Sequence, residues 1–280
     1  MFRSRPDTRP LAVSATDATQ QINGSDFEFD ITPGIEAGII GYDVAPQLDF
    51  EVRAMWLEDW TSTATESFTD TTVGISATPP LGTTGPRSGF ALYDSRFISA
   101  EFNAHYRMPQ LVQGCTVLLG IRAIRLDERL NITLTDPNAA LPDELVRTRT
   151  NNRLIGLQLG VDKVFANDCS WCLKFTGRAG LYGNNGHQRS RLISLATPPV
   201  TFPAGEDGGN LAFQAELGVS GKFRLSPCAN LIASYRVMFL DGVALAPDQI
   251  SATNFLTRTG YDSNGSLLLH GVTIGVELVF

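Results

Sequence analysis

Every second residue near the C-terminus is apolar, and this alternation restricts the fold more than any other feature of the chain. The intervening positions are mostly small or polar, and the last residue is the aromatic Phe280. Because successive side chains of a strand point to opposite faces, the pattern predicts a β-strand with one apolar and one polar face. The apolar positions are Val272, Ile274, Val276 and Leu278, and the intervening ones are Gly271, Thr273, Gly275, Glu277 and Val279.

The same alternation recurs along most of the chain, and we predict about nine strands from it. Such a period of two over runs of roughly ten residues is the sequence signature of transmembrane β-strands. The predicted strands cover residues 34–42, 48–57, 98–108, 117–126, 155–162, 171–182, 211–220, 231–239 and 266–280.

Connections between the predicted strands are alternately short and long. The short ones lie near 43–47, 109–114, 166–170 and 226–230, and the long ones near 58–89, 128–152, 184–210 and 241–266. Tight turns at one end and long loops at the other are typical of an up-and-down outer-membrane barrel with periplasmic turns and external loops. The predicted fold class is therefore all-β, an antiparallel up-and-down transmembrane β-barrel. The last strand of bacterial barrels of this kind also ends with an aromatic residue, and this arrangement would leave Phe280 at the periplasmic rim.

The composition argues against several other classes of protein. The 280-residue chain is 43% hydrophobic and 18% charged, with a formal net charge of −7. The acidic balance, and the lack of a visible basic patch, argue against a nucleic-acid partner. No run of about eighteen apolar residues is present, so we expect no transmembrane helix. The first residues lack the apolar core of a secretory signal.

A soluble β-barrel or sandwich would alternate in the same way, so the period alone leaves this alternative open. Three features of the faces favour the membrane. No charge interrupts the apolar face at mid-strand, where each would cost about 2–4 kcal/mol in a bilayer. The opposite face mixes glycine with charges of both signs, which a dry sandwich core would exclude. Aromatic residues also gather near strand ends, as in an interfacial girdle: Trp56, Tyr106, Trp171, Phe239 and Phe280.

Nine strands conflict with the even number found in single-chain bacterial barrels. The first predicted strand, near 34–42, would run inward from outside the cell, so we expect an upstream strand that this chain lacks. We accordingly divide the chain into an N-terminal extended segment, 1–25, and a barrel, 26–280. Alternatively, part of 8–16 pairs as a ragged tenth strand.

Four motifs follow one another along the chain: Gly34-Ile-Glu-Ala-Gly38, Gly120-Ile-Arg-Ala-Ile-Arg-Leu-Asp-Glu128, Arg147-Thr-Arg-Thr-Asn-Asn-Arg-Leu-Ile-Gly-Leu-Gln-Leu-Gly160 and Tyr235-Arg-Val-Met-Phe-Leu-Asp-Gly-Val-Ala-Leu-Ala-Pro-Asp-Gln-Ile250. In their order, over residues 30–255, the chain resembles the β-barrel porin family described from planctomycetes. The resemblance implies an outer-membrane location and a barrel architecture more than it implies an activity. Members of that family usually carry a signal and a Trp-rich strand ahead of the segment that matches 9–13.

The polar face of the predicted strands would line the barrel lumen with charges of both signs. These charges could line a selective pore, or they could pair into a plug. About eight strands enclose an interior that side chains just fill, whereas open channels need about sixteen. We favour the plug, with neighbouring arginines and glutamates paired because unpaired buried charges are costly. The candidate lumen residues are Glu36, Glu51, Arg53, Glu101, His105, Arg107, Arg122, Asp162, Lys174, Arg178, Glu216, Lys222, Arg236 and Glu277.

Histidines offer little evidence for catalysis. His105 lies on the predicted lumen face, His187 in a long loop, and His270 near the outer end of the last strand. A hydrolase at the outer rim would need a histidine with a nucleophile and an acid, and no nucleophile motif accompanies His187. We predict no catalytic residue, metal site or cofactor. We expect the glycine-rich run 205–209 to be a loop tip and not a phosphate cradle, because no helix follows it.

Four cysteines, Cys115, Cys169, Cys172 and Cys228, fall at or beside the predicted short turns. Cys169-Ser-Trp-Cys172 has the spacing of a redox or zinc half-site, but it precedes a strand and not a helix. In an oxidising periplasm disulfides are favoured. Strand adjacency predicts the pairs Cys115–Cys169 and Cys172–Cys228.

Together these observations predict a non-enzymatic, porin-like or structural barrel of about ten strands in the outer membrane. Its expected partners are the outer-membrane lipid and, through Phe280, the barrel-assembly machinery. Long loops would be external, and short turns periplasmic. The alternatives are a surface-binding barrel that acts through its long loops and, third, a hydrolase at the outer rim. The sequence leaves the solute, the ligand and the oligomeric state open.

Overall fold

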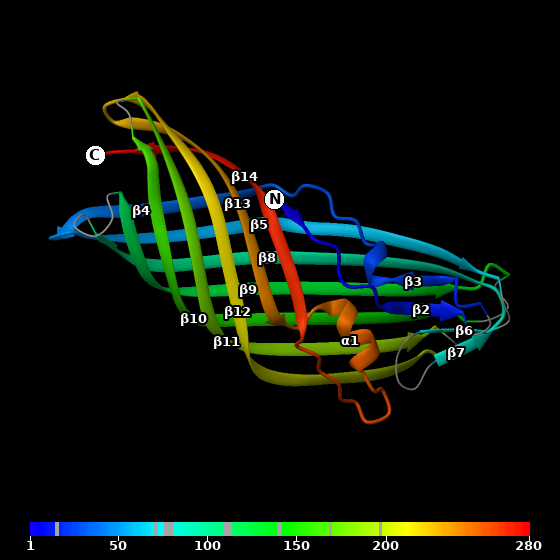
Figure 1. The fold of residues 1–280 in the computed structure, drawn as a ribbon. Coiled ribbons are helices and arrows are strands. Elements are labelled where there is room, and N and C mark those ends of the chain that lie inside the picture. Colours follow the sequence, from blue (N-terminus) through cyan, green and yellow to red (C-terminus); the bar gives the residue numbers. More distant parts are fainter. Residues whose placement is uncertain are drawn as a thin grey trace.

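Ten strands form one antiparallel sheet in which almost every strand pairs with the next one along the chain (Figure 1). The computed structural model describes residues 1–14, 17–69, 72–75, 81–108, 114–138, 142–167, 170–195 and 198–280. In spatial order the strands are β4 (Gly34–Ala45), β5 (Leu48–Phe68), β8 (Arg87–Arg107), β9 (Cys115–Thr135), β10 (Glu144–Asn167), β11 (Trp171–Ser194), β12 (Val200–Ser226), β13 (Ala229–Val243), β14 (Gly265–Leu278) and β1 (Phe2–Arg3).

A second, smaller sheet and one helix complete the structure. The second sheet has the order β3 (Gln21–Asn23), β2 (Pro10–Ser14), β6 (Thr72–Ile75) and β7 (Leu81–Thr84). A 3-10 turn, η1 (Gly24–Asp26), follows β3, and α1 (Ala246–Ala252) lies between β13 and β14. Among the described residues, no helix has both the length and the apolar character needed to cross a membrane.

The predicted all-β, up-and-down arrangement with about ten strands is confirmed, and each predicted strand falls on one strand of the main sheet. The tenth strand is β1, whose Phe2 and Arg3 pair with His270 and Leu269 of β14. Residues 10–14, which include most of the alternative tenth strand, instead form β2 of the second sheet. The N-terminal segment therefore contributes strands to both sheets.

The long strands continue far beyond the predicted ends, through most of the segments predicted to be long loops. The glycine-rich run 205–209, for example, lies within β12 and not at a loop tip. The sequence pattern did not predict the extra length, because the apolar residues change from one face of the strand to the other within each long strand. In β10, the exposed residues are apolar at Ile155, Leu157 and Leu159, but they are arginines at Arg147 and Arg149.

The phase change divides the outward face of the sheet into two regions. We call the first the apolar band, which is the set of exposed apolar side chains toward the short-turn end: Ile39, Val52, Ile98, Phe102, Leu119, Ile121, Ile155, Leu157, Leu159, Val161, Leu181, Leu217, Val219, Val272, Ile274 and Val276. We call the second the polar extension, which is the remaining part of six strands, residues 58–68, 87–97, 125–135, 144–153, 183–194 and 200–210.

On the inward face the polar and apolar regions are exchanged. Toward the short turns it is charged, whereas under the polar extension it is mainly apolar, with buried polar residues such as Glu128, Thr148 and Gln188, and is covered by α1 and the N-terminal segment (Figure 1). Leu130 of β9 and Val146 of β10 pack there with Ile250 of α1 and with Leu11 and Ile22 of the second sheet. Because a strand presents alternate residues to each face, the arginines next to Val146 must point away from this core.

Candidate functional site: a charged network on the inward face

Glu216 of β12 is the centre of a buried charged network. Its carboxylate lies 2.8 Å from Nη1 of Arg122 on β9 and 3.1 Å from Nε of Arg236 on β13. Arg53 of β5 approaches the same carboxylate at 3.5 Å. The Glu216 side chain is only 2% exposed. Side chains from three other strands therefore converge on one carboxylate of β12, which requires the sheet to curl so that these strands face one another.

Glu101 of β8 is a second centre beside the first. It accepts a hydrogen bond from Arg53, and Nη1 of Arg178 on β11 donates to it at 2.6 Å. The amide of Gln158 on β10 donates to its other oxygen at 2.9 Å. Arg122 lies 3.8 Å from this second carboxylate. The two glutamates thus share Arg53 and Arg122, and the network is continuous.

Two more glutamates complete the network at its edges. Glu36 of β4 accepts a 2.8 Å hydrogen bond from Arg236 of β13, although 200 residues separate them in the chain. Glu51 of β5 lies 3.1 Å from Nε2 of His105 and 3.7 Å from Arg178. Four arginines therefore face four glutamates, so the formal charges of the two sets cancel.

The remaining predicted lumen residues form separate pairs nearer the short turns. Lys174 lies 3.2 Å from Asp162, and Lys222 lies 3.0 Å from Glu277. Arg107 pairs with Asp49 at 3.1 Å and with Asp43 in the β4–β5 turn. A cavity of about 380 Å³ lies among these pairs, and its lining includes Glu51, Arg53, Asp162, Lys174, Lys222 and Glu277.

An apolar layer covers the network on the side away from the short turns. It is a cluster of buried side chains that sequence analysis did not identify: Met55, Leu57, Trp60, Phe97, Ile124, Leu126, Leu154, Tyr182, Ala212, Met238, Leu240, Val243, Leu245, Leu267 and Leu269. These positions share the inward face with the charges, so the alternation could have placed them inside the sheet, but not in one layer. The 380 Å³ cavity is therefore closed on one side first by ion pairs and then by apolar packing.

Glu128 of β9 links the N-terminal segment to α1 beyond this layer. Arg3 donates to its carboxylate at 2.6 Å and also donates to Tyr93 at 2.6 Å. The other carboxylate oxygen accepts the backbone N–H of Ala246 at the start of α1. The Arg3 guanidinium also stacks over the ring of Phe29. This group of contacts was not foreseen, because it depends on where β1 and α1 pack.

Among the described residues Cys115, Cys172 and Cys228 are free thiols, so the predicted Cys172–Cys228 disulfide is not present. Cys169, the predicted partner of Cys115, lies outside the described residues. Cys172 lies opposite Lys222 of β12, and β12 continues four residues further, to Ser226, before the turn that holds Cys228. Four extended residues span about 13 Å, whereas a disulfide requires Cα atoms within about 7 Å. Strands β11 and β12 are neighbours, as predicted, but the extra length of β12 places Cys228 too far from Cys172 for a disulfide.

Histidines outside the network lie in surface pairs. His187 Nδ1 of β11 lies 3.1 Å from Asp207 of β12, and Arg189 donates to the same carboxylate at 2.6 Å. The hydrogen bond from Arg189, and then that from His187, lower the pKa of Asp207 to about 2. His270 is hydrogen bonded to Tyr235 at 3.0 Å. Within the described part of the chain, no group of three histidines, cysteines or carboxylates is placed to hold a metal ion.

Comparison with known proteins assigns no family. The chain matches no family model, and it is not significantly similar to any curated protein. Its function must therefore be inferred from the geometry of the sheet and of the charged network.

Asp248 of α1 makes the packing of this helix sensitive to pH. Burial raises the pKa of its carboxyl from an ordinary 3.8 to about 6; Arg9 at 3.4 Å opposes the shift, and Asp262, Glu128 and Asp7 add to it. An acid whose pKa rises on folding holds its proton more tightly in the folded state. The protonated carboxyl therefore stabilises the folded state fully below about pH 4, and this stabilisation is lost as the pH rises through about 6.

We expect Asp248→Asn to raise the free energy of unfolding at pH 7 by about 2–3 kcal/mol, since a shift of one pKa unit corresponds to 1.36 kcal/mol. At pH 4 the same substitution should change little, because the native carboxyl is then protonated. Urea unfolding of both proteins between pH 4 and pH 7 measures this difference. A difference that stays constant across this range would contradict the role of Asp248.

Proposed function

We propose that this chain is an outer-membrane β-barrel whose interior is sealed. The observation that carries the proposal is the apolar band, because its large apolar side chains are exposed on neighbouring strands of the sheet. In β10, Leu157 and Leu159 are each 62% exposed. Soluble monomers rarely expose contiguous apolar patches larger than a few hundred Å². A bilayer would cover such a band, and strand segments of about ten residues have the length that a tilted membrane strand needs.

Contacts between the two edges of the sheet support closure into a barrel. The edges are β4 and β1, and Met1 beside β1 exchanges two backbone hydrogen bonds with Thr32, just before β4. The Arg236–Glu36 pair connects β13 to β4. Closure would leave no unpaired strand edge in lipid, where unpaired backbone groups are costly.

The sealed interior favours a structural role over conduction. The four arginines and four glutamates pair with one another, and the apolar layer lies directly above them. Ten strands are also close to the size at which side chains fill a barrel. In this orientation the short turns and the exposed Phe280 lie in the periplasm, where the assembly machinery would bind, and the polar extension is external.

A surface-binding role is the second candidate, and the polar extension is the observation that favours it. Six strands continue beyond the apolar band and enclose a core of their own with α1 and the second sheet. A channel needs no such structure, whereas a platform that presents a rigid surface outside the membrane does. The two proposals are compatible, because a sealed barrel can anchor a binding platform.

Single-channel recording on the refolded protein in planar bilayers tests the seal. We expect no conductance steps at either polarity, because ion pairs and apolar side chains occupy the cross-section. An established porin reconstituted in the same bilayers provides the positive control. Steady steps from the wild-type protein would contradict the sealed interior and would favour a conducting pore.

A further inference from the structure

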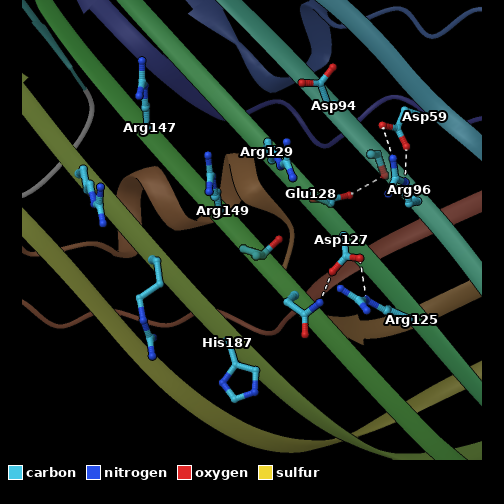
Figure 2. A pocket seen from close by; sticks show the side chains of 15 residues that line it. Asp59, Asp94, Arg96, Arg125, Asp127, Glu128, Arg129, Arg147, Arg149 and His187 are labelled. Atoms are coloured by element: carbon cyan, nitrogen blue, oxygen red, sulfur yellow. Dashed lines mark hydrogen bonds and ion pairs between the residues drawn. The ribbon is translucent and has the colours of Figure 1, made fainter.

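An arginine-rich surface lies on the outward face of the polar extension. Figure 2 shows Arg129, Arg147 and Arg149 on neighbouring strands, with α1 behind the sheet. Arg149 of β10 lies directly opposite Arg129 of β9 on one side and opposite Arg189 of β11 on the other. We call this the arginine face, and its members are Arg125, Arg129, Arg147, Arg149, Arg153, Arg189 and Arg191. It was not visible in the sequence because its residues come from three strands.

Opposed arginines recur along the same ladder. Arg147 faces Arg191 across β10 and β11, and Arg125 faces Arg153 across β9 and β10. Like charges that are directly opposite each other destabilise a pair of strands. An anion bound between the arginines would relieve this repulsion.

Carboxylates neutralise only part of the arginine face. Arg125 pairs with Asp127, and Arg189 pairs with Asp207. Arg147, Arg149 and Arg191 have no ion-pair or hydrogen-bond partner for their side chains among the described residues, and all three are exposed. Their positive charge is concentrated although the whole chain has a net charge of −7.

A shallow hollow gives this charge a place to bind a ligand. Its volume is about 450 Å³, and seven arginines and four acidic residues line it. Asn151 and His187 also line the hollow and add polar groups, and Figure 2 shows His187 below Arg147 and Arg149. A planar guanidinium binds a phosphate oxygen pair in a bidentate manner, so clustered arginines are suited to phosphate.

The position of the arginine face identifies the source of the phosphate. Arg153 is only two residues from Ile155 of the apolar band, a rise of about 7 Å along the strand. Arg149 lies four residues further along β10, about 13 Å above Arg153. The arginines thus begin at the edge of the apolar band and continue away from it, as the headgroup layer of a bilayer does.

We propose that the arginine face binds the phosphorylated headgroup of a lipid in the outer leaflet, with the acyl chains of that lipid against the apolar band. This inference rests on the proposed membrane location. Phosphates at the edge of the band would lie between Arg125 and Arg153, and those further out would lie in the hollow beside Arg147 and Arg149.

Binding of a purified phosphoglycolipid to the full-length protein in zwitterionic detergent tests the proposal. Each arginine near an anionic lipid surface contributes about 1 kcal/mol, so Arg147→Gln/Arg149→Gln should weaken binding about 30-fold. The single variant Arg149→Gln should weaken it about fivefold. Arg224→Gln, which removes an exposed charge at the short-turn end of β12, is the matched control and should leave binding unchanged.

Three further measurements separate the alternatives. The same glycolipid without its phosphates should bind weakly, and inorganic pyrophosphate should compete poorly, because it lacks the acyl chains. Equal affinity of the wild type and the double variant would overturn the proposal, and so would full competition by pyrophosphate. Flotation with phosphate-free vesicles reports membrane insertion separately. Insertion without glycolipid binding would refute the arginine face alone, whereas no insertion would refute the barrel.

Discussion

Replacing Glu216 with glutamine is expected to lower the free energy of unfolding by about 3–5 kcal/mol, the range found when one partner of a buried ion pair is removed. Arg53, Arg122 and Arg236 all approach this carboxylate within 3.5 Å. Glutamine keeps the shape of the side chain but removes its charge. The network would then hold four arginines against three glutamates, and Arg122 would keep only Glu101, at 3.8 Å, as an acidic partner.

Glu277→Gln provides the matched control on the same face of the sheet. Its partner Lys222 is 39% exposed, so water screens the pair, and we expect a loss below about 1 kcal/mol. Urea unfolding of both variants in lipid vesicles, followed by tryptophan fluorescence, gives the comparison. If the two substitutions cost the same, Glu216 is not the centre of the network.

Leu157→Arg is the second substitution with a large expected effect, because it tests the apolar band itself. An arginine at the midplane of a bilayer costs about 2–4 kcal/mol in a β-barrel. At an exposed site in water, the same change would usually stay within about 0.5 kcal/mol. Leu157 is 62% exposed at the centre of the band on β10, so the two environments predict clearly different results.

Thr63→Arg is the control for the added charge, since Thr63 is an exposed residue of β5 in the polar extension and lies opposite the uncharged Leu92 of β8. We expect this substitution to change stability by less than about 0.5 kcal/mol. The measurement is reversible folding into vesicles of each variant against the wild type. Equal effects of Leu157→Arg and Thr63→Arg would contradict the membrane location of the band.

Alternation predicted the strands of the apolar band because one face there is uniformly apolar. In β14, for example, Val272, Ile274 and Val276 are exposed on one face, as their spacing requires. The polar extension was predicted as loops for a physical reason. Its apolar residues face inward, so Leu154 and Val146 of β10 are out of phase with Ile155 and Leu157, and the period appears to end.

The sequence predicts which side chains lie on the charged face, but not which of them pair with one another. Arg122 and Glu216 are 94 residues apart, and their contact depends on how far the sheet curls. The sequence indicates that both lie on the polar face, but it does not indicate which glutamate each arginine meets. The helix α1 was missed because seven residues with a proline near the start show too little of the helical period.

The pairing of β1 with β14 has a consequence for the order of folding. From β8 to β13, each strand pairs with the next one along the chain, so these hairpins can add one after another with short loops to close. The hydrogen bond between Ser4 and Leu268 spans 264 residues. Such a contact has the largest entropic cost of closure, so it should form last and limit the rate of folding. Slow folding kinetics should therefore respond to substitutions at this junction more than to those within any single hairpin.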